Sequence, residues 1–357
     1  GRMAVDLTVM PVIASSEYQE FISLVATAKL GPLAGDLHPE SLVHAIMALD
    51  IRSRLIQESS DGIASALKLT RAIALGWIGG SIDVYLDDDP LWAELAQAKD
   101  PDEFMRKHGM QIPLGVHVPV TDAAKLALFL NAVRFYADQS APNLVIWQNR
   151  EHHGQRYVRV AQKDERAPGP ETDSPLAIYY APTPRGLVVS LNEQVVIRFL
   201  DRQAKQADSA KSKGIEPPAA ETSRPWLGES LAARVGSAGL RVLATAGLNT
   251  YRAAISLECW NNLPILNEWH RLYPDRDPAA VHEAVWGERL VCPAGGNYVW
   301  NPKWRTMEST VLGHPGEPKP GPDTIGPLHD VKSADFGITF QDGGLRATVE
   351  IERPTRH

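Results

Sequence analysis

Two adjacent histidines beside a carboxylate are the first candidates for chemistry in this sequence. His152 and His153 follow Glu151 directly, and imidazole and carboxylate groups are common zinc ligands. Neighbouring residues of a β-strand point to opposite faces, however, and no third ligand lies at the spacing of a metal site. We therefore expect Glu151-His152-His153-Gly154 to form the exposed tip of a hairpin and to bind no metal.

Three consecutive carboxylates, Asp87-Asp88-Asp89, are the second candidate, since such groups bind hard cations such as calcium. Their spacing matches no EF-hand loop, and Pro90 follows them directly. The run therefore predicts a solvated turn and no metal site.

The sequence contains no complete catalytic motif. His282-Glu283 lacks the second histidine of a zinc-protease helix, and neither a Gly-x-Ser-x-Gly turn nor a Gly-x-x-x-x-Gly-Lys phosphate loop occurs. The glycine-containing stretch from Gly76 to Gly80 precedes a predicted strand, which is the wrong order for a dinucleotide turn. We predict no catalytic residue, cofactor or metal. The alternative is a hydrolase or other enzyme whose site combines residues distant in sequence.

Aromatic residues gather near the C-terminal end, where five of the nine tryptophans fall between residues 260 and 304. Aromatic rings offer a large contact area at low entropic cost, so such a group can form a binding surface for protein or glycan. The alternative is that the rings form a core. The predicted binding surface consists of Trp260, Trp269, Trp286, Tyr298, Trp300 and Trp304.

The elements that position these residues indicate an α+β protein: an antiparallel sheet backed by helices, with a mixed helical and β C-terminal domain. The Asp, Ser, Lys and Pro content of residues 205–225 predicts a linker. We therefore expect a front domain over 1–204 and a C-terminal domain over 226–357. The predicted helices are 17–28, 39–51, 63–75, 123–137, 193–207 and most of 227–269; the predicted strands are 81–86, 115–120, 336–340 and 345–352, with hairpins over 143–160 and 176–191.

Composition excludes some classes of partner. The formal net charge of −7 argues against a broad phosphate-binding surface, so we predict no nucleic-acid partner. No run of about 20 apolar residues occurs, so the sequence predicts no membrane span.

One region resembles a known family. It comprises Cys259-Trp260-Asn261-Asn262, then Cys292-Pro293-Ala294-Gly295-Gly296-Asn297-Tyr298-Val299-Trp300, and last Gly313-His314-Pro315. These residues resemble the C-terminal region of type IV pilin-like proteins and pseudopilins. The sequence departs from the family pattern at Glu308-Ser309-Thr310, where a last cysteine would fall, and in the order of Gly313-His314. The front part, with residues 75–80 and 179–190, looks like bacterial envelope proteins of unknown function.

The resemblance implies a disulfide between Cys259 and Cys292, which would add roughly 3 to 4 kcal/mol of stability by closing a loop. Two reduced, buried thiols are the alternative. The resemblance to pilin-like proteins also implies an extracytoplasmic protein that binds or assembles with protein or glycan at the cell envelope. We expect its signal or anchor to lie upstream of Gly1.

Overall fold

The computed structural model describes residues 2–9, 16–25, 29–30, 38, 41–163, 173–184, 186–213, 225–341 and 344–353. The chain divides into two compact units. Unit 1 comprises Gly1–Glu94, Arg106–Leu240 and Val331–His357, and unit 2 comprises Leu95–Met105 and Arg241–Asp330. Most of unit 2 is therefore an insertion between two segments of unit 1.

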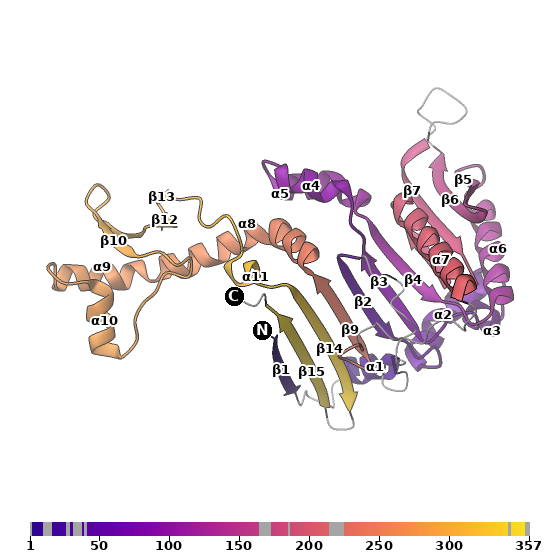
Figure 1. Ribbon diagram of the computed structural model, residues 1–357, viewed down its shortest axis with the longest axis horizontal. Helices are drawn as coiled ribbons and strands as arrows, with labels where there is room; N and C mark the ends of the chain where they lie inside the picture. Colours follow the sequence, from indigo (N-terminus) through magenta and orange to yellow (C-terminus); the bar gives the residue numbers. More distant parts are fainter. Residues whose placement is uncertain are drawn as a thin grey trace. The chain divides into compact units, whose positions relative to one another are not determined.

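Unit 1 is built on one antiparallel sheet, to which the described residues contribute eleven strands in the order β1-β15-β14-β9-β2-β3-β4-β8-β7-β6-β5 (Figure 1). Strands distant in sequence are neighbours, since β1 pairs with β15 and β9 lies between β14 and β2. The strands are β1 (Arg2–Val9), β2 (Val43–Ala48), β3 (Ser81–Leu86), β4 (Leu114–Pro119), β5 (Val145–His152), β6 (Gln155–Lys163), β7 (Asp173–Pro182), β8 (Gly186–Ser190), β9 (Leu231–Gly236), β14 (Ser333–Gln341) and β15 (Gly344–Glu352).

The helices of the first 240 residues connect these strands. Local capping accounts for some of their starts: the Asp122 carboxylate accepts a hydrogen bond from the backbone N–H of Lys125 at 3.0 Å. The helices are α1 (Ser16–Val25), α2 (Arg54–Ala66), α3 (Arg71–Ala74), α4 (Pro90–Gln97), α5 (Pro101–His108), a 3-10 turn η1 (Gly109–Gln111), α6 (Ala123–Ser140), α7 (Glu193–Lys213) and the start of α8 (Ser237–Asn261).

The α+β class and both predicted hairpins are confirmed, since β5 pairs with β6 and β7 with β8. The helix predicted over 39–51 is wrong, because this segment contains the central strand β2. Its apolar residues lie on both faces of the strand, a pattern that periodicity alone does not distinguish from a helix. Strand β9 lies within the region predicted to be largely helical, and β1 was not predicted.

The predicted division at 205–225 does not coincide with the division between the units. Residues 205–213 continue α7, and 214–224 lie outside the described residues. Strands β9, β14 and β15, expected in a separate C-terminal domain, join the same sheet as β2 and β3. Backbone pairing between distant segments therefore overrides the compositional signal at the predicted linker.

The sheet is covered unevenly on its two faces. On one face, α7 packs against β4, β7 and β8, where Val188 and Ala181 contact a core of Val195, Val196 and Phe199. On the other face, α6 covers the same end of the sheet through Leu126 and Leu187. Figure 1 shows α6 and α7 on either side of this end.

Unit 2 contains most of α8, the helices α9 (Leu263–Leu272), α10 (Pro278–Trp286) and α11 (Gly326–His329), and a small sheet of β10 (Tyr298–Asn301), β11 (Thr306–Ser309), β12 (Gly313–His314) and β13 (Glu317–Pro318). One core joins Cys259 and Cys292 to Leu312, and another joins Leu266 to Met307. Among the described residues, no helix combines the length and the apolarity that crossing a membrane requires.

Candidate functional site

The most unusual surface of unit 1 is one face of the sheet over β1, β15, β14, β9, β2 and β3. Residues paired across antiparallel strands lie on the same face, so the register identifies its members, which we call the apolar face. They form three cross-strand rows: Met3, Ile351, Ala334, Val235, Val43 and Leu86; Val5, Val349, Phe336, Ala233, Ala45 and Val84; and Leu7, Ala347, Ile338, Leu231, Met47 and Ile82.

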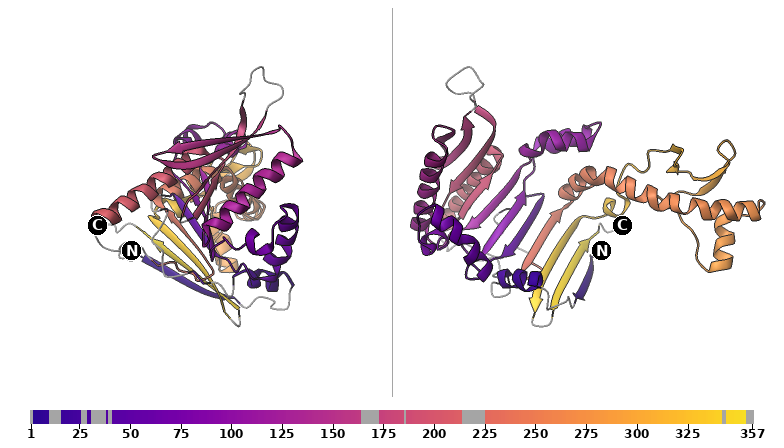
Figure 2. Two further views of the ribbon diagram at one scale, coloured as in Figure 1. Left: turned by 90° about the vertical axis from the view of Figure 1, so that its right-hand side faces the viewer. Right: turned by 180° about the vertical axis from the view of Figure 1, so that it is seen from behind.

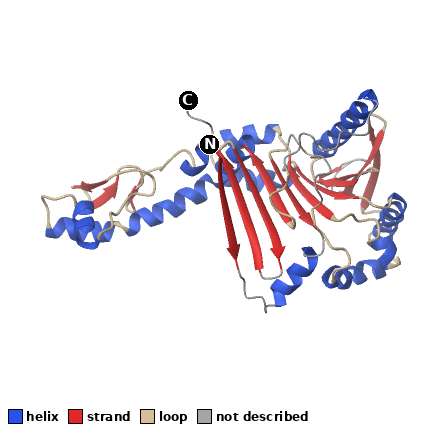
Figure 3. Cartoon of the chain, turned by 60° about the horizontal axis from the view of Figure 1, so that its bottom comes forward, coloured by secondary structure: helices blue, strands red, loops and turns tan. Residues whose placement is uncertain are grey.

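All eighteen of these residues are apolar, yet none is buried. At the edge strand β1, Met3, Val5 and Leu7 are 47%, 50% and 57% exposed, and Val84 on the central strand β3 is 36% exposed. Among the described helices of unit 1, none is drawn across β1, β15 and β14 in Figure 1, in the rear view of Figure 2 or in Figure 3. On these three strands the apolar face therefore has no helix of the described part of unit 1 packed over it, as an apolar sheet face normally has.

The opposite face of the same six strands is mostly polar. On the outer strands it carries ion pairs, Asp6 with Arg346 at 3.2 Å and Arg234 with Asp335 at 3.1 Å. Towards β2 and β3 the polar side chains become buried, and this face is covered. Over β2 and β3, the usual arrangement with the apolar face covered and the polar face exposed is therefore reversed.

A buried histidine–aspartate cluster lies on this polar face. Asp83 of β3 is bonded to His44 of β2, with Oδ1 3.2 Å from Nε2, and to His117 of β4, with Oδ2 3.0 Å from Nδ1. Burial alone would raise the pKa of the Asp83 carboxyl, but the hydrogen bonds from His117 and His44 lower it below its ordinary value of 3.8. Glycine at 186 makes room for this arrangement, because a Cβ there would overlap Nε2 of His117.

His38 and Tyr85 extend this cluster towards α7. The His38 ring stacks on Tyr85, with 3.6 Å between ring centroids, and lies 5.9 Å from the ring of Phe199 on α7. Burial lowers the pKa of His38, and the nearby charges of His44, Arg202 and His117 act in the same direction. The imidazole is therefore neutral in the folded protein.

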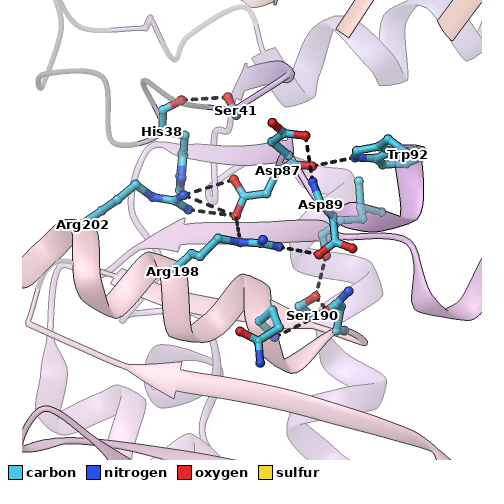
Figure 4. Close-up of polar contacts among 12 residues, drawn as sticks. His38, Ser41, Asp87, Asp89, Trp92, Ser190, Arg198 and Arg202 are labelled. Atoms are coloured by element: carbon cyan, nitrogen blue, oxygen red, sulfur yellow. Dashed lines mark hydrogen bonds and ion pairs between the residues drawn. The ribbon is translucent and has the colours of Figure 1, made fainter. Parts of the chain in front are cut away.

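Asp87 joins α7 to the end of β3 (Figure 4). Arg202 donates to Asp87 from both terminal nitrogens, at 3.1 and 3.3 Å, and Arg198 lies between Asp87 and Asp89. Burial raises the pKa of Asp87, while the two arginines oppose this effect. The solvated turn predicted for Asp87-Asp88-Asp89 is therefore wrong at Asp87, because an arginine from a distant helix allows this carboxylate to be buried.

These buried groups have side chains that also serve in catalysis, but here they bond to one another under α7. His117 is 0% and Asp83 4% exposed, so neither presents a reactive atom at the surface. Their hydrogen bonds connect β2 and β4 to β3. These partners are far apart in the sequence, so no spacing rule connects them; a polar residue within each strand, such as His44, Asp83 or His117, is a signal that could indicate them.

A second polar cluster lies where the β5–β6 hairpin meets α7. Nε2 of His152 is 2.7 Å, and Nε2 of His153 3.8 Å, from Oδ1 of Asp201. The sequence offers no third ligand at the spacing of a metal site, but in the structure Asp201 approaches both histidines from α7, 49 positions from His152. One donor atom from each of the three residues lies within 4.8 Å of the others, and among the described residues this is the group whose geometry suits a metal ion.

The structure divides the predicted aromatic surface. Trp286, Trp300 and Trp304 are 70%, 38% and 47% exposed. Trp260 and Tyr298 are half-buried beside the two cores of unit 2, and Trp269 donates from Nε1 to Nδ1 of His282 at 3.0 Å. The first three rings are accessible to a partner, and a binding role for them stays a prediction.

The predicted disulfide is not formed in the structure. Cys259 and Cys292 are free thiols with their Sγ atoms 3.6 Å apart, buried in one core of unit 2. Ser309, which stands where the pilin-like pattern would place its last cysteine, has its Oγ 3.2 Å from Sγ of Cys292. Burial is the main cause of the raised pKa of Cys259, which keeps this thiol protonated.

Comparisons with protein-family models, curated proteins and solved structures gave no match. They neither support nor contradict the resemblance to pilin-like proteins.

Proposed function

We propose that this chain is a binding or assembly protein and that it assembles through the apolar face of its large sheet. The observation that carries the proposal is that none of the eighteen apolar side chains of this face is buried: Met3, Val5, Leu7 and Val84 are exposed, and the other fourteen are partly exposed. Contiguous apolar surface of this extent is rarely left in water and marks an interaction site.

The extent of the face fits a protein interface. Six strands about 4.8 Å apart, each contributing five residues at about 3.3 Å, cover roughly 29 by 17 Å, or about 500 Å². A standard interface buries about 800 Å² on each partner, so this face supplies more than half of one side, and surrounding residues supply the rest.

The partner that we propose is a second copy of this chain. A face without charged side chains is complementary to itself, which a two-fold dimer requires. Two such sheets would pack face to face about 10 Å apart, with interdigitating side chains. A lipid surface is disfavoured by the net charge of −7, because the membrane surfaces that attract peripheral proteins are anionic.

The proposal is tested by the oligomeric state of two matched variants. Val5 and Ala4 are neighbours on β1 and are both exposed, but they lie on opposite faces of the sheet. Val5→Glu places a charge in the proposed interface, whereas Ala4→Glu places it on the polar face. We expect analytical ultracentrifugation to show a dimer for the wild type and for Ala4→Glu, and at least tenfold weaker association for Val5→Glu.

Two results would overturn the proposal. One is a wild type that stays monomeric at every concentration tested; flotation of this monomer with phosphatidylcholine vesicles would then identify lipid as the occupant of the face. The other is equal association of the two variants, since the dimer would then use a different surface.

The extracytoplasmic location implied by the pilin-like residues belongs to the same proposal. An oxidising compartment favours formation of a disulfide between thiols as close as those of Cys259 and Cys292, whose Sγ atoms are 3.6 Å apart. Protein isolated from its native source should then show no titratable thiol after unfolding without reductant. Two titratable thiols would agree with the free pair in the structure and would contradict the location.

A further inference from the structure

The cluster of His152, His153 and Asp201 brings together three metal-ligating side chains from a hairpin and a helix. Its members are 25%, 71% and 37% exposed at the side chain, so an ion can reach them from solvent. We propose that these three residues bind one divalent transition-metal ion, Zn²⁺ in the first instance, with water in the fourth position.

The distances suit a tetrahedral site after small side-chain movements. Ligand atoms about 2.0 to 2.1 Å from zinc stand about 3.3 Å from one another in a tetrahedron. The distance from Asp201 Oδ1 to His152 Nε2 is 2.7 Å and that to His153 Nε2 is 3.8 Å, and all three ligand atoms lie within 4.8 Å. The first distance must lengthen and the second must shorten by about half an ångström. Rotation of the partly exposed Asp201 side chain permits the first change, and rotation of the exposed His153 side chain permits the second.

The backbone explains why adjacent histidines meet one ligand. His152 pairs with Gln155, so His153 and Gly154 form a two-residue hairpin turn, and both have positive φ, 49° and 76°. Such a turn is of type I′, and it removes His153 from the alternation of the strand. The expectation that the two imidazoles point to opposite faces therefore fails at this position.

Other contacts hold the hairpin beside α7. Glu193, two turns before Asp201 on the helix, accepts hydrogen bonds from Arg150 of β5 and from Tyr157 of β6, at 2.5 and 2.8 Å. Contacts between protein side chains thus join the hairpin to the helix. A bound ion would add a second connection nearer the tip of the hairpin.

The ligand set favours zinc among the common ions. Two imidazole nitrogens and one carboxylate oxygen are borderline ligands that suit zinc, copper or nickel, whereas calcium and magnesium prefer oxygen ligands.

The test is calorimetric titration of the full chain with ZnCl₂ after removal of metal by a chelator. The wild type should bind one ion per chain, and His153→Ala, His152→Ala and Asp201→Asn should each weaken binding at least tenfold. His108→Ala is the matched control, since His108 lies outside the cluster and bonds to Gln111; it should bind as the wild type does. Circular dichroism of each variant establishes that it is folded.

Cobalt gives a second, spectroscopic readout. Co²⁺ bound tetrahedrally by the wild type should show the intense visible absorption that octahedral Co²⁺ lacks, and His153→Ala should lose it. The proposal is overturned if the wild type binds no zinc under these conditions. It is also overturned if binding persists unchanged in all three cluster variants, because the ion would then sit elsewhere on the surface.

Discussion

Replacing Asp83 by Ala tests whether the buried histidine–aspartate cluster stabilises unit 1. The change removes the acceptor of two hydrogen bonds, from His44 at 3.2 Å and from His117 at 3.0 Å, and leaves both imidazoles buried. A hydrogen bond to an ionised group contributes about 1.5 to 3 kcal/mol, so the loss should lower the free energy of unfolding by about 3 to 6 kcal/mol.

The assay is urea unfolding followed by circular dichroism, whose β-sheet signal comes mainly from the large sheet. Asp6→Ala is the matched control, because Asp6 is bonded to Arg346 and Thr348 but is 52% exposed at the side chain. Because this ion pair is exposed, Asp6→Ala should lower the free energy of unfolding by less than about 1 kcal/mol. If Asp83→Ala lowers the free energy of unfolding by no more than Asp6→Ala does, our account of the cluster is refuted.

Asp83 should also affect how the free energy of unfolding depends on pH in the acidic range. Because the folded-state pKa of Asp83 lies below its ordinary value of 3.8, the folded protein releases this proton more readily than the unfolded chain does. The stabilisation is therefore complete above pH 3.8 and is lost as the pH falls through the folded-state pKa. Asp83→Ala should show a flatter decline in stability over that acidic range than the wild type.

Two further predictions concern neighbours of this cluster. Burial lowers the pKa of His38 below 6.5, so its contribution is present above pH 6.5 and is lost on acidification. Between pH 6.5 and 5 the wild type should lose about 1.5 kcal/mol more than His38→Phe in urea unfolding, and parallel pH profiles would contradict this. Gly186→Ala should lower stability by about 1 to 3 kcal/mol, because the added Cβ overlaps His117. Gly80→Ala, whose Cβ would meet open space, should change thermal stability little, and equal effects of the two substitutions would refute the crowding argument.

Sequence signals identified the elements that local residues determine. The hairpin at His153 and Gly154 has a two-residue turn between β-rich runs, and the helix after Asp122 begins with a capping side chain. In contrast, β2 was mistaken for a helix, because its identity as a strand depends on pairing with β3 and β9.

The functional residues were harder to predict for the same reason. Asp201 lies 49 positions from His152, and Arg202 lies 115 positions from Asp87. No spacing rule connects residues so far apart, and only the fold brings them together. The apolar face likewise depends on the register of strands that span nearly the whole chain, so alternation within one strand shows which residues share a face but not whether that face is covered.

The pairing of β1 with β15 has a consequence for synthesis of the chain in the cell. β1 pairs with β15 in the described sheet, and about 335 residues separate the end of one strand from the start of the other. At 5 to 20 residues per second, a ribosome needs roughly 20 to 70 s to make that interval. During this time Met3, Val5 and Leu7 lack their pairing partners on β15, so a nascent chain that carries them should be a substrate for chaperones until β15 emerges.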